Sequence, residues 1–267
     1  MGKIIAVTNQ KGGVGKTTTS VNVAASLVAC KRRVLLVDLD PQGNATMGSG
    51  VNKQVLETST YDVLMGESPI ESTIVSTGEI GYDLLPSNSD LTAAEVQLLD
   101  IPRREQRMRE ALERVKHRYD YIFIDCPPSL NMLTLNALVA SEAVMIPMQC
   151  EYYALEGLTA LVNTIEEIRS TLNPTLKIEG LLRTMYDPRN RLSNDVTIQL
   201  QKYFGDRVYR TVIPRNIRLA EAPSHGVPVL LYDKASRGAQ AYLALAGEMV
   251  RREEQQMANA SENAVTA

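Results

Sequence analysis

The fold of this chain is decided by residues 9–18, Asn-Gln-Lys-Gly-Gly-Val-Gly-Lys-Thr-Thr. Residues 3–8, just before them, are a short apolar run without helical periodicity, which is typical of a buried parallel strand. Residues 19–28, just after them, repeat apolar side chains at helical spacing. A glycine-rich loop between a strand and a helix binds phosphate, because backbone N–H groups and the helix N-terminus point at it. The sequence therefore predicts a nucleotide site.

The residues of this loop have separate expected roles. Its glycines lack a Cβ, so the loop can take strained dihedrals and phosphate oxygens can approach the backbone. We expect Lys16 to reach the β- and γ-phosphates and the Thr17 hydroxyl to bind Mg²⁺. The predicted nucleotide-binding residues of the loop are Lys11, Gly12, Gly13, Val14, Gly15, Lys16, Thr17 and Thr18.

The loop departs from the common phosphate loop at one position. A glycine is usual where this chain has Gln10, and an additional lysine, Lys11, follows it. The segment resembles the deviant Walker A loop of the ParA/MinD superfamily. The resemblance implies that Lys11 crosses a dimer interface to the partner's nucleotide, where a second cation would stabilise charge as an arginine finger does. A solvated surface lysine is the alternative interpretation.

Two more apolar runs end in carboxylates. Residues 34–40 lead to Asp38 and Asp40, and residues 121–125 end at Asp125. Ligands of open α/β sheets bind beyond the carboxyl ends of the strands, so we expect these acids beside the phosphates. Asp125 has the form of a Walker B residue, which holds Mg²⁺ directly or through water. A turn-forming aspartate is the alternative. The predicted metal-binding residues are Thr17, Asp40 and Asp125.

Strands and helices alternate along the whole chain. Further strands are predicted over 82–86, 143–148, 177–185 and 208–213, with helices over 61–65, 70–75, 90–118, 131–140, 154–172, 196–204, 218–222 and 236–254. This order predicts a single-domain α/β fold, a doubly wound, mostly parallel sheet flanked by helices. We expect the domain to span 1–257 and the small, polar residues 258–267 to be disordered.

The composition limits the class of protein. Hydrophobic residues make up 44% and charged residues 22%, as in ordinary globular proteins. No run of 18 apolar residues is present, so no transmembrane helix is expected. Cys30, Cys126 and Cys150 lack close spacing, which suits reduced thiols in a cytoplasm. With no Trp and two Phe, an aromatic platform for single strands is disfavoured.

The charge is distributed unevenly. Residues 183–218 hold eight basic and three acidic side chains, a net charge of +5, which leaves −8 for the rest of a chain whose total is −3. Such asymmetry indicates either a surface for polyanions or scattered solvated charge, and the count alone favours neither. The basic residues are Arg183, Arg189, Arg191, Lys202, Arg207, Arg210, Arg215 and Arg218.

The resemblance to the ParA/Soj chromosome-partitioning ATPases covers about residues 3–255. It rests on the loop and on three segments: Leu-Val-Asp-Leu-Asp-Pro-Gln-Gly-Asn at 36–44, Ile-Asp-Cys-Pro-Pro-Ser at 124–129, and Ile-Pro-Arg-Asn-Ile-Arg-Leu-Ala-Glu-Ala-Pro-Ser-His-Gly at 213–226. It implies a P-loop NTPase that uses ATP and Mg²⁺ and is a weak ATPase without its partner. It implies catalytic roles for Lys11, Lys16 and Asp40, with Asp40 placing the attacking water.

The same resemblance implies further contacts. Pro214 would pack near adenine, with Met185 and Arg215 also in the nucleotide site. Arg189 and Arg218, and more weakly Arg191 and Arg215, would bind double-stranded DNA without sequence preference once ATP has formed a homodimer. Such binding fits the basic segment, because phosphate contacts supply non-specific affinity. A ParB-like partner would stimulate hydrolysis, and the protein would be cytoplasmic and associated with the nucleoid.

Other functions share the phosphate loop. A related ATPase could position plasmid, flagellar, cellulose-synthase or carboxysome machinery, and the sequence does not distinguish these cargoes from a chromosome. We expect no DNA-binding domain ahead of Lys3, which argues against the larger plasmid type that also represses its own promoter. A MinD-like membrane switch needs an amphipathic C-terminal helix with bulky apolar residues, and residues 248–267 lack that face, so no membrane partner is expected. An iron–sulfur relative needs a pair of cluster-binding cysteines, and the three cysteines of this chain are badly placed to form one. A structural ATP-binding scaffold is the last alternative.

Overall fold

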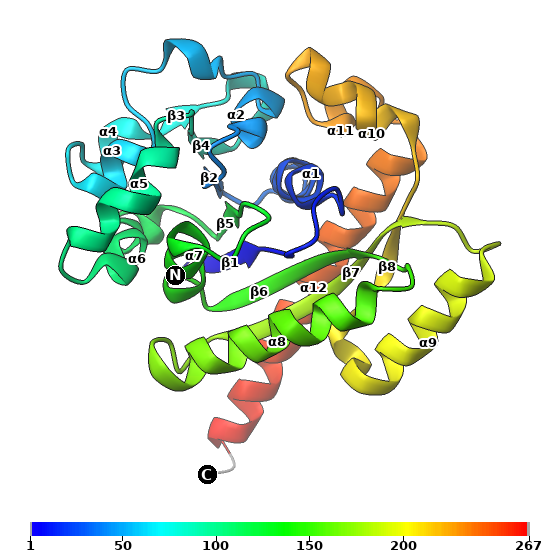
Figure 1. Cartoon of the computed structure of the whole chain (residues 1–267). Coiled ribbons are helices and arrows are strands. Elements are labelled where there is room, and N and C mark those ends of the chain that lie inside the picture. The colour runs from blue at the N-terminus through cyan, green and yellow to red at the C-terminus, as the bar shows by residue number, and fades with distance from the viewer. Residues whose placement is uncertain (1, 266–267) are drawn as a thin grey trace.

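A single twisted sheet runs through the molecule, as the computed structural model shows (Figure 1). The structure describes residues 2–265, and the side chains of residues 2–259. Among these residues the strand order is β3-β4-β2-β5-β1-β6-β7-β8. The strands are β1 (Lys3–Val7), β2 (Val34–Asp38), β3 (Val75–Ser76), β4 (Asp83–Leu85), β5 (Tyr121–Asp125), β6 (Ala143–Gln149), β7 (Lys177–Tyr186) and β8 (Val208–Pro214). β3 pairs antiparallel with β4, and the other pairings are parallel.

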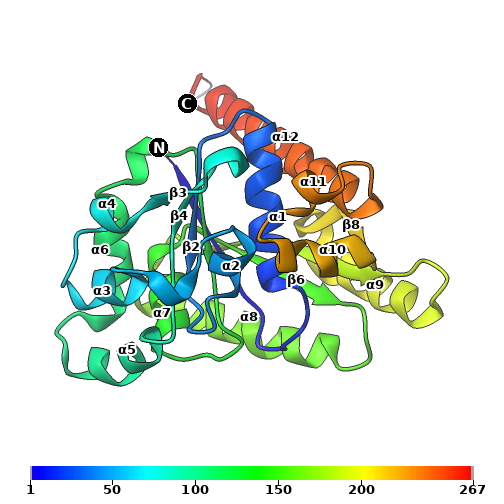
Figure 2. The same cartoon turned by 90° about the horizontal axis from the view of Figure 1, so that it is seen from above.

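Helices cover both faces of this sheet, as Figure 2 shows from above. They are α1 (Lys16–Ala29), α2 (Asn44–Gly48), α3 (Thr60–Met65), α4 (Ile70–Thr73), α5 (Leu91–Gln97), α6 (Arg107–Glu113), α7 (Met132–Ala140), α8 (Ala154–Thr171), α9 (Arg191–Phe204), α10 (Ile217–Glu221), α11 (Val229–Tyr232) and α12 (Arg237–Val265). α1 and α12 pack on one face, and α3 and α5 to α9 pack on the other. The predicted doubly wound α/β fold is confirmed.

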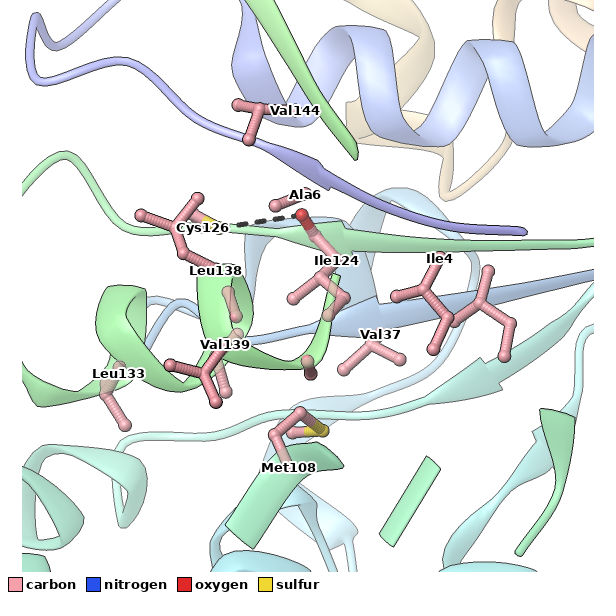
Figure 3. Packing of buried hydrophobic residues seen from close by; sticks show 14 of the residues in the cluster. Ile4, Ala6, Val37, Met108, Ile124, Cys126, Leu133, Leu138, Val139 and Val144 are labelled. Carbon is pink, nitrogen blue, oxygen red and sulfur yellow. Dashed lines mark hydrogen bonds between the residues drawn. The ribbon is translucent and has the colours of Figure 1, made fainter. Parts of the chain in front are cut away.

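The apolar strands fill two separate cores. In β1, Ile4 and Ala6 belong to one buried cluster and Ile5 and Val7 to the other. This division follows from the strand geometry, because successive side chains point to opposite faces of the sheet. Figure 3 shows the first cluster, where Ile4 and Ala6 pack with Ile124 and with side chains from α6 and α7. Burial on both faces explains why the strands are continuous apolar runs.

Several elements differ from the sequence predictions. The stretch 90–118 is divided into α5, α6 and short 3-10 turns, because Pro102 cannot continue a helix and Arg103 has a φ of 56°. β3 and α11 were not predicted. The sequence predicts disorder over 258–267, whereas α12 continues to Val265, and residues 266 and 267 lie outside the described residues. Extending an existing helix needs no new nucleation, which favours this continuation.

The sheet topology brings three strand ends together. β5 lies between β1 and β2, so Asp125 is aligned with Val7 on one side and with Asp38 on the other. The glycine-rich loop follows β1, and the Asp40 loop follows β2. The predicted phosphate, metal and carboxylate residues therefore meet at one edge of the sheet. Within residues 2–265, no helix is both long and apolar enough to cross a membrane.

Candidate nucleotide site

The glycine-rich loop has the conformation that a phosphate-binding loop needs. Gly13 and Gly15 have φ angles of 72° and 88°, a left-handed region in which a side chain would be strained. α1 begins directly after Gly15, which gives this helix no side-chain cap. The first N–H groups of a helix lack partners within it, so this terminus presents free donors to an anion.

Residues from the neighbouring strands hold the loop in place. The side chain of Asn9 donates to the carbonyl oxygen of Pro147 at 2.8 Å and accepts from the backbone N–H of Lys11 at 3.0 Å. The Thr184 hydroxyl donates to the oxygen of Val14 at 2.8 Å, and the Gln149 amide donates to that of Gly13 at 3.2 Å. The ends of β6 and β7 thus fix the loop from one side.

Lys16 is a buried cation with a weak protein partner. Its side chain is largely buried, and Nζ donates to the backbone oxygen of Lys11 across a long 3.4 Å. Burial lowers the pKa of Lys16, although Asp125 and Asp40 oppose this effect. A desolvated ammonium without a close acceptor is stabilised by a phosphate oxygen. The position therefore fits a nucleotide phosphate.

Thr17 and Asp125 form the part of the site that fits Mg²⁺. The Thr17 hydroxyl donates to Oδ2 of Asp125 at 2.7 Å, and Ser20 donates to Oδ1 at 2.8 Å. Burial, with Asp38 nearby, raises the pKa of Asp125 to about 7. Among the described residues, no group of three or more His, Cys, Asp or Glu side chains could hold an ion alone. Mg²⁺ would therefore be shared with phosphate oxygens and water, as this ion prefers.

The two acids after β2 have different environments. Asp38 is fully buried, and its Oδ2 accepts from both the N–H and the hydroxyl of Thr46, each at 2.7 Å. Burial raises the pKa of Asp38 to about 6 against these hydrogen bonds. Asp40 lines the open cavity, and its Oδ1 accepts from the N–H of Gln42 at 2.9 Å. Asp38 therefore orders the loop, whereas Asp40 can reach a ligand.

Two cavities adjoin the loop. The phosphate cavity, of about 370 Å³, lies over the glycines, Lys16, Thr17 and Asp40. The base cavity, of about 190 Å³, is bordered by Ile213, Pro214, Arg215, Asn216, Leu219, Ala220, Tyr242 and Thr184. Gly15, Thr18 and Met185 line both cavities. A nucleotide can therefore place its phosphates in one cavity and its base in the other, with Met185 at the junction.

Met185 has a strained backbone conformation. Its φ of 49° is unusual for a side chain of this size, and β7 is irregular in its pairing here. The Gln149 amide approaches its sulfur at 2.7 Å. Sequence reasoning missed Gln149, although it stands at the carboxyl end of β6, beside β1, where ligand contacts are expected.

Lys11 is placed differently from the other predicted loop residues. Its Nζ lies 2.5 Å from Oε2 of Glu151, and the two side chains are 45% and 51% exposed. Lys11 is not among the residues that border the phosphate cavity, and Val14 is buried beneath the loop. In the single chain the additional lysine therefore pairs with a carboxylate of its own subunit.

The predicted DNA-binding residues stand on or beside different elements and are mostly engaged by neighbours. Arg189, just before α9, makes a two-pronged contact with Asp187, and Arg218 of α10 pairs with Glu221 and Asp233. Figure 1 shows α9 and α10 apart. Arg191 opens α9, and Arg215 borders the base cavity.

Arg183 contributes nothing to a surface. It is 6% exposed and donates to the backbone oxygens of Tyr209 and Arg210. The charge count over 183–218 therefore overstates the exposed positive charge.

Known proteins match this chain along most of its length. A family model described as an AAA domain matches residues 2–178. The chromosome partitioning protein ParA of Caulobacter vibrioides is 51% identical over 97% of this chain and 98% of that protein. The sporulation initiation inhibitor protein Soj of Bacillus subtilis is 56% identical over 93% of this chain and 98% of that protein. This chain belongs to the ParA/Soj family.

A solved structure of the same fold contains a nucleotide. The crystal structure of cobyrinic acid a,c-diamide synthase from Mycobacterium smegmatis with bound ADP and magnesium has a TM-score of 0.83. It is 38% identical to this ParA/Soj chain and covers 95% of it and 96% of itself. The fold of this chain thus accommodates a nucleotide together with Mg²⁺.

Proposed function

We propose that this chain is a chromosome-partitioning ATPase that hydrolyses ATP to ADP and phosphate with Mg²⁺. ATP closes two subunits into a sandwich dimer, the dimer binds double-stranded DNA without sequence preference, and a ParB-like partner stimulates hydrolysis and releases it. The observation that carries the proposal is the convergence of Lys16, Asp40 and Thr17, with its partner Asp125, on one cavity, while Lys11 stands on the same loop outside that cavity.

The residues of the cavity divide the work of hydrolysis. Lys16 and the N–H groups that open α1 hold the β- and γ-phosphates. Mg²⁺, held through Thr17 and Asp125, neutralises charge that develops on the phosphate oxygens. Asp40 accepts a hydrogen bond from a water and points it at the γ-phosphorus. The water oxygen bonds to that phosphorus as the bond to the β-phosphate oxygen breaks, the water loses a proton to the phosphate or to solvent, and ADP and phosphate leave.

The isolated subunit is a slow catalyst in this proposal. Phosphoryl transfer requires full neutralisation of charge at the γ-phosphate, and a second cation supplied in trans accelerates it strongly. Lys11 is the candidate for that cation, because it stands on the loop but outside its own cavity. Turnover therefore depends on the partner subunit and on the ParB-like protein that completes the site.

DNA binding follows from dimerisation. A dimer presents Arg189 and Arg218 twice, and linking two weak sites raises their joint affinity without new contacts. Because these contacts are made to phosphates, affinity falls steeply as salt increases. The DNA must also displace Asp187, Glu221 and Asp233 from the two arginines, so each free subunit binds weakly.

The test is binding to non-specific duplex DNA with ATP, with ADP and without nucleotide, across a salt series. We expect salt-sensitive binding with ATP that persists in Asp40→Ala, which cannot turn over. Binding should be lost in Arg189→Glu/Arg218→Glu but kept in Arg33→Glu/Arg169→Glu, which reverses two other exposed, ion-paired arginines. A wild-type dimer with ATP that does not bind DNA would overturn the proposal.

A further inference from the structure

The segment that carries Arg218 also forms a wall of the base cavity. α10, the 3-10 turn η7 (Ala222–His225) and α11 make up residues 217–232, here named the α10–α11 segment. Leu219 and Ala220 border the base cavity, whereas Arg218 beside them is exposed and ion-paired. Leu219 also packs so closely on α12 that a Cβ at Gly238 would lie 2.7 Å from its Cγ.

A buried asparagine joins the same segment to the phosphate loop. The side-chain oxygen of Asn22 in α1 accepts from the N–H of Val229 at 2.7 Å. The amide of Asn22 donates to the backbone oxygen of Thr18, also at 2.7 Å. Thr18 lines both cavities, so a buried side chain connects the nucleotide site to α11.

The third contact joins two backbones directly. Gly50, just after α2, lies against Gly226 at the end of η7, and Figures 1 and 2 both show α2 beside the α10–α11 segment. A Cβ on Gly226 would lie 3.0 Å from Cα of Gly50, and one on Gly50 would lie 2.9 Å from the oxygen of Gly226. The two backbones are in direct contact, so neither can move toward the other without displacing it.

The Gly50 end of this contact is tied to the loop that carries Asp40. Thr46 of α2 donates twice to Asp38, and its hydroxyl accepts from the N–H of Ser87. The Ser87 hydroxyl donates in turn to the backbone oxygen of Asp40. Gly50 lies two residues after the five-residue α2, and its N–H donates to the oxygen of Met47 in that helix, so a short hydrogen-bonded segment links the Asp40 loop to Gly50.

We propose that the Gly50–Gly226 contact transmits the state of the Asp40 loop to the α10–α11 segment and so sets the DNA affinity of Arg218. The inference rests on the proposed function, and it names the coupling between its two sites. A γ-phosphate beside Asp40 favours one position of the loop, and packed backbones pass on such a shift because they cannot deform continuously. Asn22 and the wall of the base cavity contact the segment on its other side, and because ATP and ADP carry the same base, these contacts do not distinguish the two nucleotides.

The chain offers a matched control for this contact. Gly226 and Gly78 have φ angles of 65° and 61°, but a Cβ on Gly78 meets no heavy atom within 4 Å. Gly226→Ala and Gly78→Ala therefore carry the same backbone strain and differ in the contact with Gly50. Gly226→Asn and Gly78→Asn form a second pair, because asparagine tolerates this backbone region better than alanine.

The measured quantity is the ratio of DNA affinity with ATP to that with ADP, with ATP-dependent dimerisation and basal hydrolysis as companion readouts. In the Gly226 variants we expect the ratio to fall at least about tenfold, within the range of allosteric couplings, while dimerisation and hydrolysis stay unchanged. The Gly78 variants should keep the wild-type ratio. The inference would be overturned if the Gly226 and Gly78 variants had equal ratios of DNA affinity with ATP to that with ADP. It would also be overturned if the Gly226 variants lost dimerisation together with DNA binding.

If the Gly226 variants do not fold, a measurement on the wild-type protein still tests the inference. Hydrogen exchange of the amides of residues 217–226 should differ between ATP and ADP without DNA, and the difference should persist in Asp40→Ala. Identical exchange with the two nucleotides would overturn the inference. A wild-type protein that dimerises with ATP but does not bind DNA would instead refute the proposed function, so the two failures are distinguishable.

Discussion

The ammonium of Lys11 lies 2.5 Å from the carboxylate of Glu151, two residues after the end of β6. The pair joins the phosphate loop to the residues before α8, 140 positions along the chain. Because Lys11 is the residue proposed to act on the nucleotide of a second subunit, it must leave Glu151 when the dimer closes. Breaking this ion pair is then part of the free energy of dimerisation.

Glu151→Gln is expected to strengthen ATP-dependent dimerisation modestly. Both side chains are half exposed, and exposed ion pairs stabilise by about 1 kcal/mol at most, which corresponds to about fivefold in the dimerisation constant. Analytical sedimentation in the presence of ATP measures this dimerisation constant. Glu156→Gln, an exposed acid of α8, removes the same charge and should change nothing. A weaker dimer for Glu151→Gln would place Glu151 in the interface rather than in competition with it.

Thr17→Ala is expected to abolish the Mg²⁺-dependent part of nucleotide affinity. The hydroxyl donates to Asp125 and is proposed to face Mg²⁺, and losing such an orienting group costs about 10- to 100-fold in affinity. Titration of ADP with Mg²⁺ and with EDTA separates the two contributions, and the EDTA value should match the wild type. Thr17→Ser keeps the oxygen and should bind normally. An equal loss in EDTA would mean that the change disturbs the loop itself.

The stability of the nucleotide-free protein should fall as pH rises from about 4 to 7, because Asp125 has a raised folded-state pKa of about 7. A carboxyl whose pKa is raised on folding contributes stability below the unfolded pKa and loses it as pH rises through the folded value. The loss is on the order of 1–4 kcal/mol. Urea unfolding of wild type and Asp125→Asn over this range measures it.

Asp38 also contributes to this dependence of stability on pH. Its pKa is also raised, to about 6, so a smaller slope should remain in Asp125→Asn. Saturating Mg²⁺ and nucleotide should flatten the wild-type profile, because the bound cation favours the carboxylate. Parallel profiles for wild type and Asp125→Asn would show that Asp125 is ionised throughout.

The sequence predicts the fold well because the deciding signals are local. Each parallel strand is an apolar run of its own, and the glycine loop fixes the connection from β1 to α1. β3 and α11 are too short, at two and four residues, to show any periodicity. The site residues after β1, β2 and β5 follow from the carboxyl-end rule, which places them together before any contact is known.

Contacts made across the chain were not predictable in the same way. Nothing near Lys11 points to Glu151, and nothing near Gly226 points to Gly50, because both partners are brought close by the sheet order. Arg183 shows a different limit. It was counted as surface charge, although it stands in β7 directly after Leu181 and Leu182, a run that is buried on both faces.

Substitutions of Arg183 and Arg189 are therefore expected to have opposite effects: the first should lower stability, and the second should weaken DNA binding. Arg183→Gln removes buried hydrogen bonds to Tyr209 and Arg210, and charged hydrogen bonds of this kind stabilise by about 1.5–3 kcal/mol. The free energy of unfolding should fall by about that amount, while the salt dependence of DNA binding stays as in the wild type.

Arg189→Gln should leave stability within about 0.5 kcal/mol, because its side chain is 88% exposed and an isolated surface pair contributes little. It should weaken DNA binding with ATP and lower the slope against salt by about one counterion per lost phosphate contact. Urea unfolding and a salt series on the two variants measure both quantities. A reduced salt slope in Arg183→Gln, with stability unchanged, would mean that Arg183 leaves the interior to meet DNA, which its two backbone acceptors oppose.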